Sequence, residues 1–132
     1  MLKTKSIFAE ISPEDGLRIS VMSRHTLNDG ITPDTRITPN LSYDEHRVEL
    51  APPARLVGMW YRKTIDWAGF ANEYSAYLRG LKASRSVREL AEMALRRDVT
   101  ILCVEPKGEN CHRLILAENC KQLYPGLRIE HL

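Results

Sequence analysis

The 132-residue sequence has no apolar run of the roughly 18 residues that a membrane span requires. Its first residues, MLKTKSIFAEIS, lack the long apolar stretch and the small-residue cleavage site of a secretory signal. It has only 3 cysteines, an odd number crowded between Cys103 and Cys120, whereas secreted domains spread paired cysteines over the fold. We therefore expect a cytoplasmic protein with no membrane partner.

An excess of one charge is also missing. The 19 basic and 17 acidic side chains leave a net charge of +2, and the densest basic clusters lie in an expected helix, where a solvated face explains them. A nucleic-acid binder usually has a basic stripe, so no nucleic-acid partner is expected. The sequence has no glycine-rich phosphate loop, which removes support for nucleotide hydrolysis or dinucleotide binding. No cofactor is expected.

The composition is that of one globular domain. Hydrophobic residues make up 43% of the chain and charged residues 27%, and 132 residues suffice for a single core. We find no internal repeat, so residues 1–132 are expected to form one domain. A long loop is expected at about residues 24–53, where glycine and proline interrupt every candidate element.

Periodicity and capping residues predict the secondary structure. Asp66 is expected to cap one helix, and Ser86 with Glu89 to form a capping box on the next. Val99–Pro106 is a continuous apolar run, typical of a strand covered on both faces. The expected strands are Ser6–Glu10, Leu17–Ser23, Val99–Val104 and Leu127–Glu130, and the expected helices are Pro53–Arg62, Trp67–Leu81, one from Ser86 and Cys111–Leu123.

The order of these elements predicts an α/β fold. We expect a small, largely parallel sheet of about four strands with helices on both faces, ending in a βαβ unit formed by the last strand, helix and strand.

A candidate site follows from this fold, because open α/β sheets bind ligands beyond the carboxyl ends of their strands. There the chain places Glu105 and then Asn110-Cys111-His112-Arg113 at a helix start, where free amides and the helix dipole favour an anion. Arg113 and Asn110 would bind the anion. The same dipole would stabilise a Cys111 thiolate as a nucleophile, with His112 as proton carrier and Glu105 as base.

Simpler interpretations stay open beside this one. Cys111 can be a small residue packed at a helix start, Cys103 a core thiol and Cys120 a core or surface filler. Arg113 can form a surface salt bridge with Glu109 or Glu118. A metal held by Cys103, Cys111 and His112 is the less favoured alternative, since the seven-residue gap between the cysteines differs from the tight pairs of structural zinc sites. No metal site is expected.

Arg24 and His25 form a second candidate cluster. They follow the strand that ends at Ser23, so in a parallel sheet they would share a rim with Cys111 and add to the anion site. The alternative is an ordinary exposed loop.

Three stretches of the chain resemble the family called domain of unknown function 488. They are RISVMSRHTLNDG at Arg18–Gly30, LAPPARLVGMWYRKTIDWAGFANEYSAYL at Leu50–Leu78, and VTILCVEPKGENCHRLILAENC at Val99–Cys120. The last carries the most specific motif, Cys-x-Glu followed by Cys-His-Arg. The middle one is similar to the shorter, tryptophan-containing branch, which usually has Trp-Pro-Arg-Gly where this chain has Arg24-His25-Thr26-Leu27. The resemblance implies a compact α/β fold in a bacterial or archaeal cytosol. It implies no activity.

Two functions are consistent with these observations. One is a thiol-dependent enzyme that acts on an anionic small molecule at Cys111-His112-Arg113. The other is a non-catalytic ligand-binding or regulatory module that uses the same rim. The sequence gives no indication of the oligomeric state.

Overall fold

The computed structural model describes residues 1–132. Its strands form one five-stranded sheet in which every strand pair is parallel. The strands lie in the order β3-β2-β4-β1-β5, so β4 and β1 are in the centre. Their bounds are β1 Leu2–Ser6, β2 Leu17–Ser20, β3 Glu45–His46, β4 Val99–Cys103 and β5 Ile129–His131.

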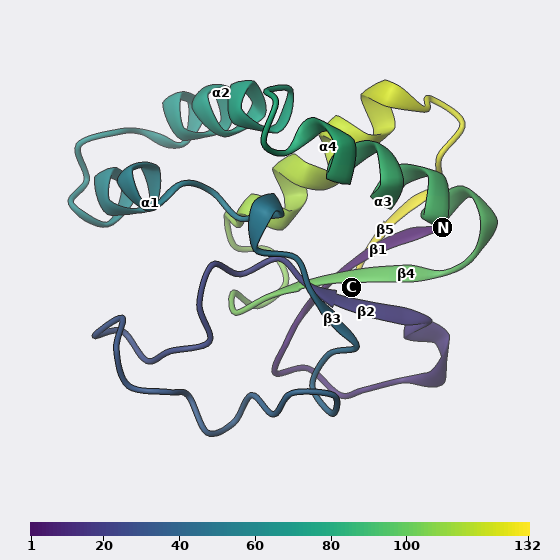
Figure 1. Ribbon diagram of the computed structural model, residues 1–132, viewed down its shortest axis with the longest axis horizontal. Coiled ribbons are helices and arrows are strands. Elements are labelled where there is room, and N and C mark those ends of the chain that lie inside the picture. Colours follow the sequence, from purple (N-terminus) through teal and green to yellow (C-terminus); the bar gives the residue numbers. More distant parts are fainter.

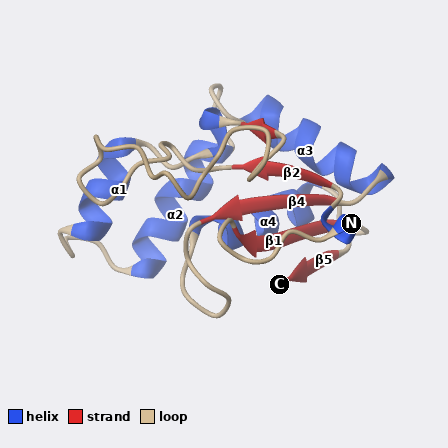
Figure 2. Cartoon of the chain, turned by 90° about the horizontal axis from the view of Figure 1, so that it is seen from below, coloured by secondary structure: helices blue, strands red, loops and turns tan.

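The helices are α1 Ala54–Tyr61, α2 Trp67–Leu78, α3 Ser84–Arg96 and α4 His112–Leu123, and two short 3₁₀ turns lie at Pro13–Asp15 and Val48–Leu50. Figure 1 shows the four helices above the sheet. In Figure 2, the view from below, the strands and the long loops lie in front of the helices. The helices therefore share one face of the sheet, and loops cover the other face.

The expected α/β fold, with a parallel sheet and a terminal βαβ unit (β4-α4-β5), is confirmed. Two details are corrected: the sheet has five strands, and helices cover one face only. The order of the strands explains why the helices lie on one face of the sheet. The connections β3 to β4 and β4 to β5 run toward the β5 edge, while β1 to β2 and β2 to β3 run the other way. Since crossovers are right-handed, the first two pass over one face and the last two over the opposite face.

Local signals for the helices agree with the structure in one case and differ in another. The Asp66 carboxylate accepts a hydrogen bond from the Gly69 amide at 2.7 Å, so it caps α2 as expected. The expected capping box at Ser86 is wrong, because α3 begins two residues earlier at Ser84. The Ser86 hydroxyl instead donates to the Glu49 carboxylate at 2.7 Å.

The main core lies between the helices and the sheet. Alternate strand residues such as Ile19, Val99 and Ile101 are fully buried there against α3 and α4. Because β4 is buried along its whole length, it extends rigidly to Cys103 at its carboxyl end. This strand end and the start of α4 position the candidate site.

The first strand was misplaced: the expected strand at Ser6–Glu10 is β1 at Leu2–Ser6. The cause is that Lys3 and Lys5 are buried on the loop-covered face, where lysine is rarely found. Lys5 Nζ lies 2.9 Å from Asp15 Oδ1, and Arg18 Nη1 lies 2.5 Å from Asp15 Oδ2. This face of the sheet is thus stabilised by a buried ionic network.

The region from the end of β2 to α1 is mostly irregular, in agreement with the expected loop at 24–53, except that it contains β3 and a 3₁₀ turn. None of the helices has the length and apolar character needed to cross a membrane.

Candidate active site

The candidate site lies where β4 ends and α4 begins. Cys103 is the last residue of β4, and it continues the alternation of Val99 and Ile101 toward the helices. Cys111 is the N-cap of α4, and its own side chain makes no capping hydrogen bond. The loop between them carries Glu105. The expected placement of Cys111 at the helix start is therefore confirmed.

Two sulfurs and one imidazole nitrogen converge in this corner. The ligand atoms of Cys103, Cys111 and His112 all lie within 4.8 Å of one another. His112 Nδ1 lies 3.7 Å from Cys103 Sγ, and its Nε2 lies 2.8 Å from the Val21 carbonyl oxygen at the end of β2. Because a carbonyl only accepts, Nε2 carries a proton, and Nδ1 is the ring nitrogen that faces the Cys103 sulfur. Cys103, interpreted from the sequence as a core thiol, thus belongs to the cluster.

The carboxylate of Glu105 joins this cluster from the loop. It accepts a hydrogen bond from the Cys103 thiol, with Sγ 3.1 Å from Oε2. Burial raises the pKa of Glu105, but hydrogen bonds from Cys111 and Cys103 outweigh it, so the pKa is lowered overall. Glu105 is therefore ionised at neutral pH and accepts hydrogen bonds from the thiols.

The thiol of Cys111 is buried, with 2% of its surface exposed. The hydrogen bond with Cys103, followed by burial, raises the pKa of the Cys111 thiol. The hydrogen bond and charge of His112 lower this pKa, but only in part. The lowered pKa that we expected for Cys111 at the helix start is thus outweighed.

The pKa of His112 is shifted as well. Burial lowers it, but Cys111, the Val21 carbonyl and Glu105 raise it overall.

Arg113 lies beside the cluster and is almost completely buried, with 1% of its surface exposed. Its Nη2 lies 3.4 Å from the Pro106 carbonyl, and Nη1 lies 4.0 Å from Glu105 Oε2, the limit of an ion pair. Nε and Nη1 have no hydrogen-bond partner. The surface salt bridge considered from the sequence, with Glu109 or Glu118, is not formed.

Two tyrosines missed by the sequence interpretation border the site. The ring of Tyr74 in α2 meets the His112 ring edge-on, with centroids 5.7 Å apart at 85°. Tyr61 is the last residue of α1, and 72% of its surface is exposed. Partial desolvation, followed by the charges of Glu105, Cys103 and Cys111, raises the pKa of its phenol. Both tyrosines had been assigned to helices, but only tertiary packing brings those helices to the site.

The other sequence candidates lie apart from this cluster. Arg24 is exposed, and its Nη1 donates to the Gly30 carbonyl at 3.1 Å within its own loop. His25 Nε2 lies 2.7 Å from the Ser20 hydroxyl, and the His25 ring stacks near His46 at 4.1 Å. Ser20 alternates with the helix-facing Ile19 and Val21, so His25 lies on the loop-covered face. Asn110 is exposed at the loop end.

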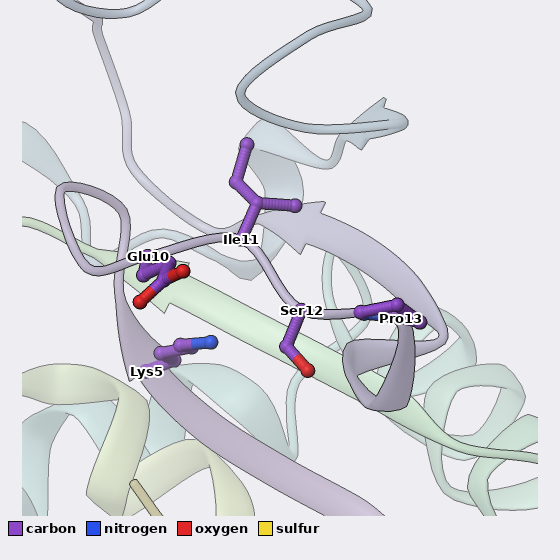
Figure 3. Close-up of a pocket in the computed structure, with 5 residues that line it drawn as sticks. All are labelled: Lys5, Glu10, Ile11, Ser12 and Pro13. Carbon is purple, nitrogen blue, oxygen red and sulfur yellow. The ribbon is translucent and has the colours of Figure 1, made fainter.

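Two further features can be set apart from the site. Cys120 is buried against the Val87 carbonyl of α3, and burial raises its pKa to about 12, as expected of a core thiol. A surface hollow of about 360 Å³ is lined by Lys5, Glu10, Ile11, Ser12 and Pro13. Figure 3 labels these residues. The only cation of this hollow, Lys5, is already paired with Asp15, so the hollow has no free charge to bind an anion.

Comparison with known proteins gives one match. The family model described as the active DUF488-N3 subclade matches residues 2–123, nearly the whole chain. No curated protein and no solved structure matches.

Proposed function

The chain belongs to the active DUF488-N3 subclade, and we propose that it is an enzyme that binds an anionic small molecule at Arg113, beside the cluster of Cys103, Cys111 and His112. The description of the subclade as active supports an enzyme. The side chains at the end of β4 and the start of α4 support the location.

The observation that carries the proposal is the buried guanidinium of Arg113, in which Nε and Nη1 have no hydrogen-bond partner. A buried charge costs several kcal/mol unless it is paired and hydrogen-bonded. Arg113 Nε and Nη1 nevertheless have no partner, and the nearest carboxylate oxygen is 4.0 Å away. An anion with two oxygens can accept from Nε together with Nη2, or from Nη1 together with Nη2, in the bidentate manner usual for arginine. Arg113 is therefore best explained as an anion receptor.

The start of α4 supports the same ligand. Arg113 is the second residue of α4, so its guanidinium and the free amides of the first turn belong to one helix start. Glu105 would repel an anion, but it lies in an exposed loop and 28% of its side chain is accessible. It can turn toward water when a ligand arrives.

The thiol–imidazole cluster supports chemistry next to that anion. We assign Cys111 as nucleophile, with His112 Nδ1 and Glu105 as the proton acceptors, since Glu105 and the imidazole both contact the thiols. The raised pKa of Cys111 means that the empty site holds a thiol, and the chemistry must begin with loss of its proton.

A non-catalytic binding module is the second candidate. It is favoured by the burial of Cys111, because a thiol with 2% exposure reaches a substrate only if the site opens. Both candidate functions include binding of the anion, but only the thiol-dependent enzyme uses Cys111. If the protein is such an enzyme, Cys111→Ser must abolish turnover of the bound ligand.

The anion can be tested by calorimetric titration of the reduced protein with inorganic phosphate. We expect saturable binding that is lost in Arg113→Met and retained in Cys111→Ser. Arg24→Ala is the control, because Arg24 is exposed and bonded within its own loop. Equal phosphate affinity in the wild type and Arg113→Met would overturn the proposal.

A further inference from the structure

We infer that Cys103, Cys111 and His112 bind one thiophilic divalent cation, of the Zn²⁺ or Co²⁺ type, through their two sulfurs and the imidazole Nδ1. This concerns the site of the proposed function and rests on that proposal only for the ligand that completes the coordination. In the metal-bound protein Nδ1 of His112 is a ligand, so Glu105 alone remains as the proton acceptor. It departs from the expectation of no metal site.

The first argument is geometric. Metal–sulfur bonds of about 2.3 Å and metal–nitrogen bonds of about 2.0 Å place tetrahedral ligand atoms about 3.5–3.8 Å apart. His112 Nδ1 and Cys103 Sγ are already 3.7 Å apart. No pair among the three ligand atoms exceeds 4.8 Å, so side-chain shifts of about 1 Å close the site. The spacing of the cysteines along the chain differs from that of a zinc finger, but the fold brings their sulfurs and the imidazole close together.

The second argument is the orientation of the imidazole. Zinc-binding histidines usually donate their other ring nitrogen to a carboxylate or a carbonyl, which fixes the tautomer. His112 Nε2 lies 2.8 Å from the Val21 carbonyl oxygen, so the ring already has that arrangement. The edge-on contact with Tyr74 holds it from the side. Nδ1 is therefore the ring nitrogen that faces the sulfurs and becomes the ligand.

The third argument is the state of the thiols. Both cysteines are buried, with 4% and 2% of the surface exposed for Cys103 and Cys111, and neither forms a disulfide. Binding converts two S–H groups into two sulfur–metal bonds and releases two protons to the solvent, with no change of oxidation state. A cation thus supplies the driving force for deprotonation that the empty site lacks.

Charge balance is the fourth argument. Two thiolates cancel a divalent cation, and Glu105 cancels Arg113, so the filled corner is neutral. Three protein ligands leave a tetrahedral ion with one open position, the arrangement of catalytic rather than structural zinc. That position is available to Glu105, whose Oε2 is 3.1 Å from Cys103 Sγ, or to an anion held by Arg113.

The test is titration of the reduced, chelator-treated protein with Co²⁺, monitored by visible absorption. We expect one ion per chain, the intense bands of a tetrahedral site with thiolate charge transfer, and displacement by Zn²⁺. Cys103→Ser, Cys111→Ser and His112→Gln should each weaken binding by at least about 100-fold. Cys120→Ser is the matched control and should bind normally, since Cys120 faces Val87 instead.

A second measurement needs no variant. Zn²⁺ added to the wild-type protein at neutral pH should release two protons per ion bound. No stoichiometric binding, an octahedral Co²⁺ spectrum, or no proton release would overturn the inference. The outcome is independent of the proposed anion. Phosphate binding at Arg113 without Co²⁺ binding would reject only the metal, and Co²⁺ binding with phosphate affinity unchanged in Arg113→Met would reject only the anion.

Discussion

Two buried arginines on opposite faces of the sheet differ in how they are satisfied. Arg18 in β2 is 4% exposed, pairs with Asp15, and donates from Nε and Nη2 to the Ser42 carbonyl at 3.1 and 2.9 Å. Arg113 in α4 is 1% exposed, and its Nε and Nη1 donate to nothing.

We interpret this difference as that between a charge that stabilises the fold and a charge that binds a ligand. The partners of Arg18 come from the loops that cover its face, so that region is complete without a ligand. Burial raises the pKa of Asp15, but the Ser12 amide, Lys5 and Arg18 hold it below its usual value. Arg113 is buried at the carboxyl end of the sheet, where the Glu105 carboxylate approaches it only to 4.0 Å, and we interpret it as a group that binds a ligand.

The largest effect is expected from Arg18→Met. It leaves Asp15 with Lys5 as its remaining cationic partner and removes the donors to Ser42, so the free energy of unfolding should fall by about 3–5 kcal/mol. Urea denaturation measures this. A loss below about 1 kcal/mol would mean that the ionic network is not structural.

A smaller effect is expected at His25 on the loop-covered face. Burial, followed by the charge of His46, lowers the pKa of His25 to about 4. The unfolded chain therefore takes up a proton below about pH 6.5, while the folded chain does so only near pH 4. The free energy of unfolding should fall by about 1–2 kcal/mol as the pH drops through this window, the shift being discounted for partial exposure.

The matched variant for this pH dependence is His25→Asn, which should flatten the part of the stability profile between about pH 6.5 and pH 4. A profile that is the same in both proteins would show that another group titrates there.

The smallest change in stability is expected from Arg113→Met, although Arg113 is the more deeply buried arginine. Replacing an unpaired charge by an apolar side chain of similar length is often neutral or stabilising. The free energy of unfolding without ligand should change by less than about 1 kcal/mol or increase. A loss as large as that of Arg18→Met would make Arg113 structural and contradict the proposed site.

The same pair of variants should respond differently to anions. Phosphate at about 100 times its dissociation constant should add about 2.7 kcal/mol to the stability of the wild type. It should add nothing to Arg113→Met and the full amount to Arg18→Met, if that variant folds. Thermal unfolding with and without phosphate measures this. Equal stabilisation of all three proteins would indicate a non-specific salt effect.

Local sequence patterns predicted much of the fold because they reflect local physics. The apolar run at Val99 gives β4, and Asp66 caps α2. The position of β1 was missed because the burial of Lys3 and Lys5 depends on partners distant in the sequence. The side on which the helices lie was missed because it follows from the order of strands in the sheet, which no local pattern encodes.

For the site, the Cys-His-Arg triplet and Glu105 were found because a strand end and a helix start can be read from periodicity. The contribution of Cys103 could have been found by continuing the alternation of β4 toward the helices. The contributions of Tyr61 and Tyr74 could not, since they depend on how α1 and α2 pack. The unpaired state of Arg113, which decides the proposal, is visible only in three dimensions.

The most direct measurement is a crystal structure of the protein grown with phosphate or sulfate. We expect an anion within hydrogen-bond distance of Arg113 Nε or Nη1, with Glu105 turned away from the guanidinium. A structure in which Arg113 closes a full salt bridge with Glu105, and no anion lies at the start of α4, would contradict it.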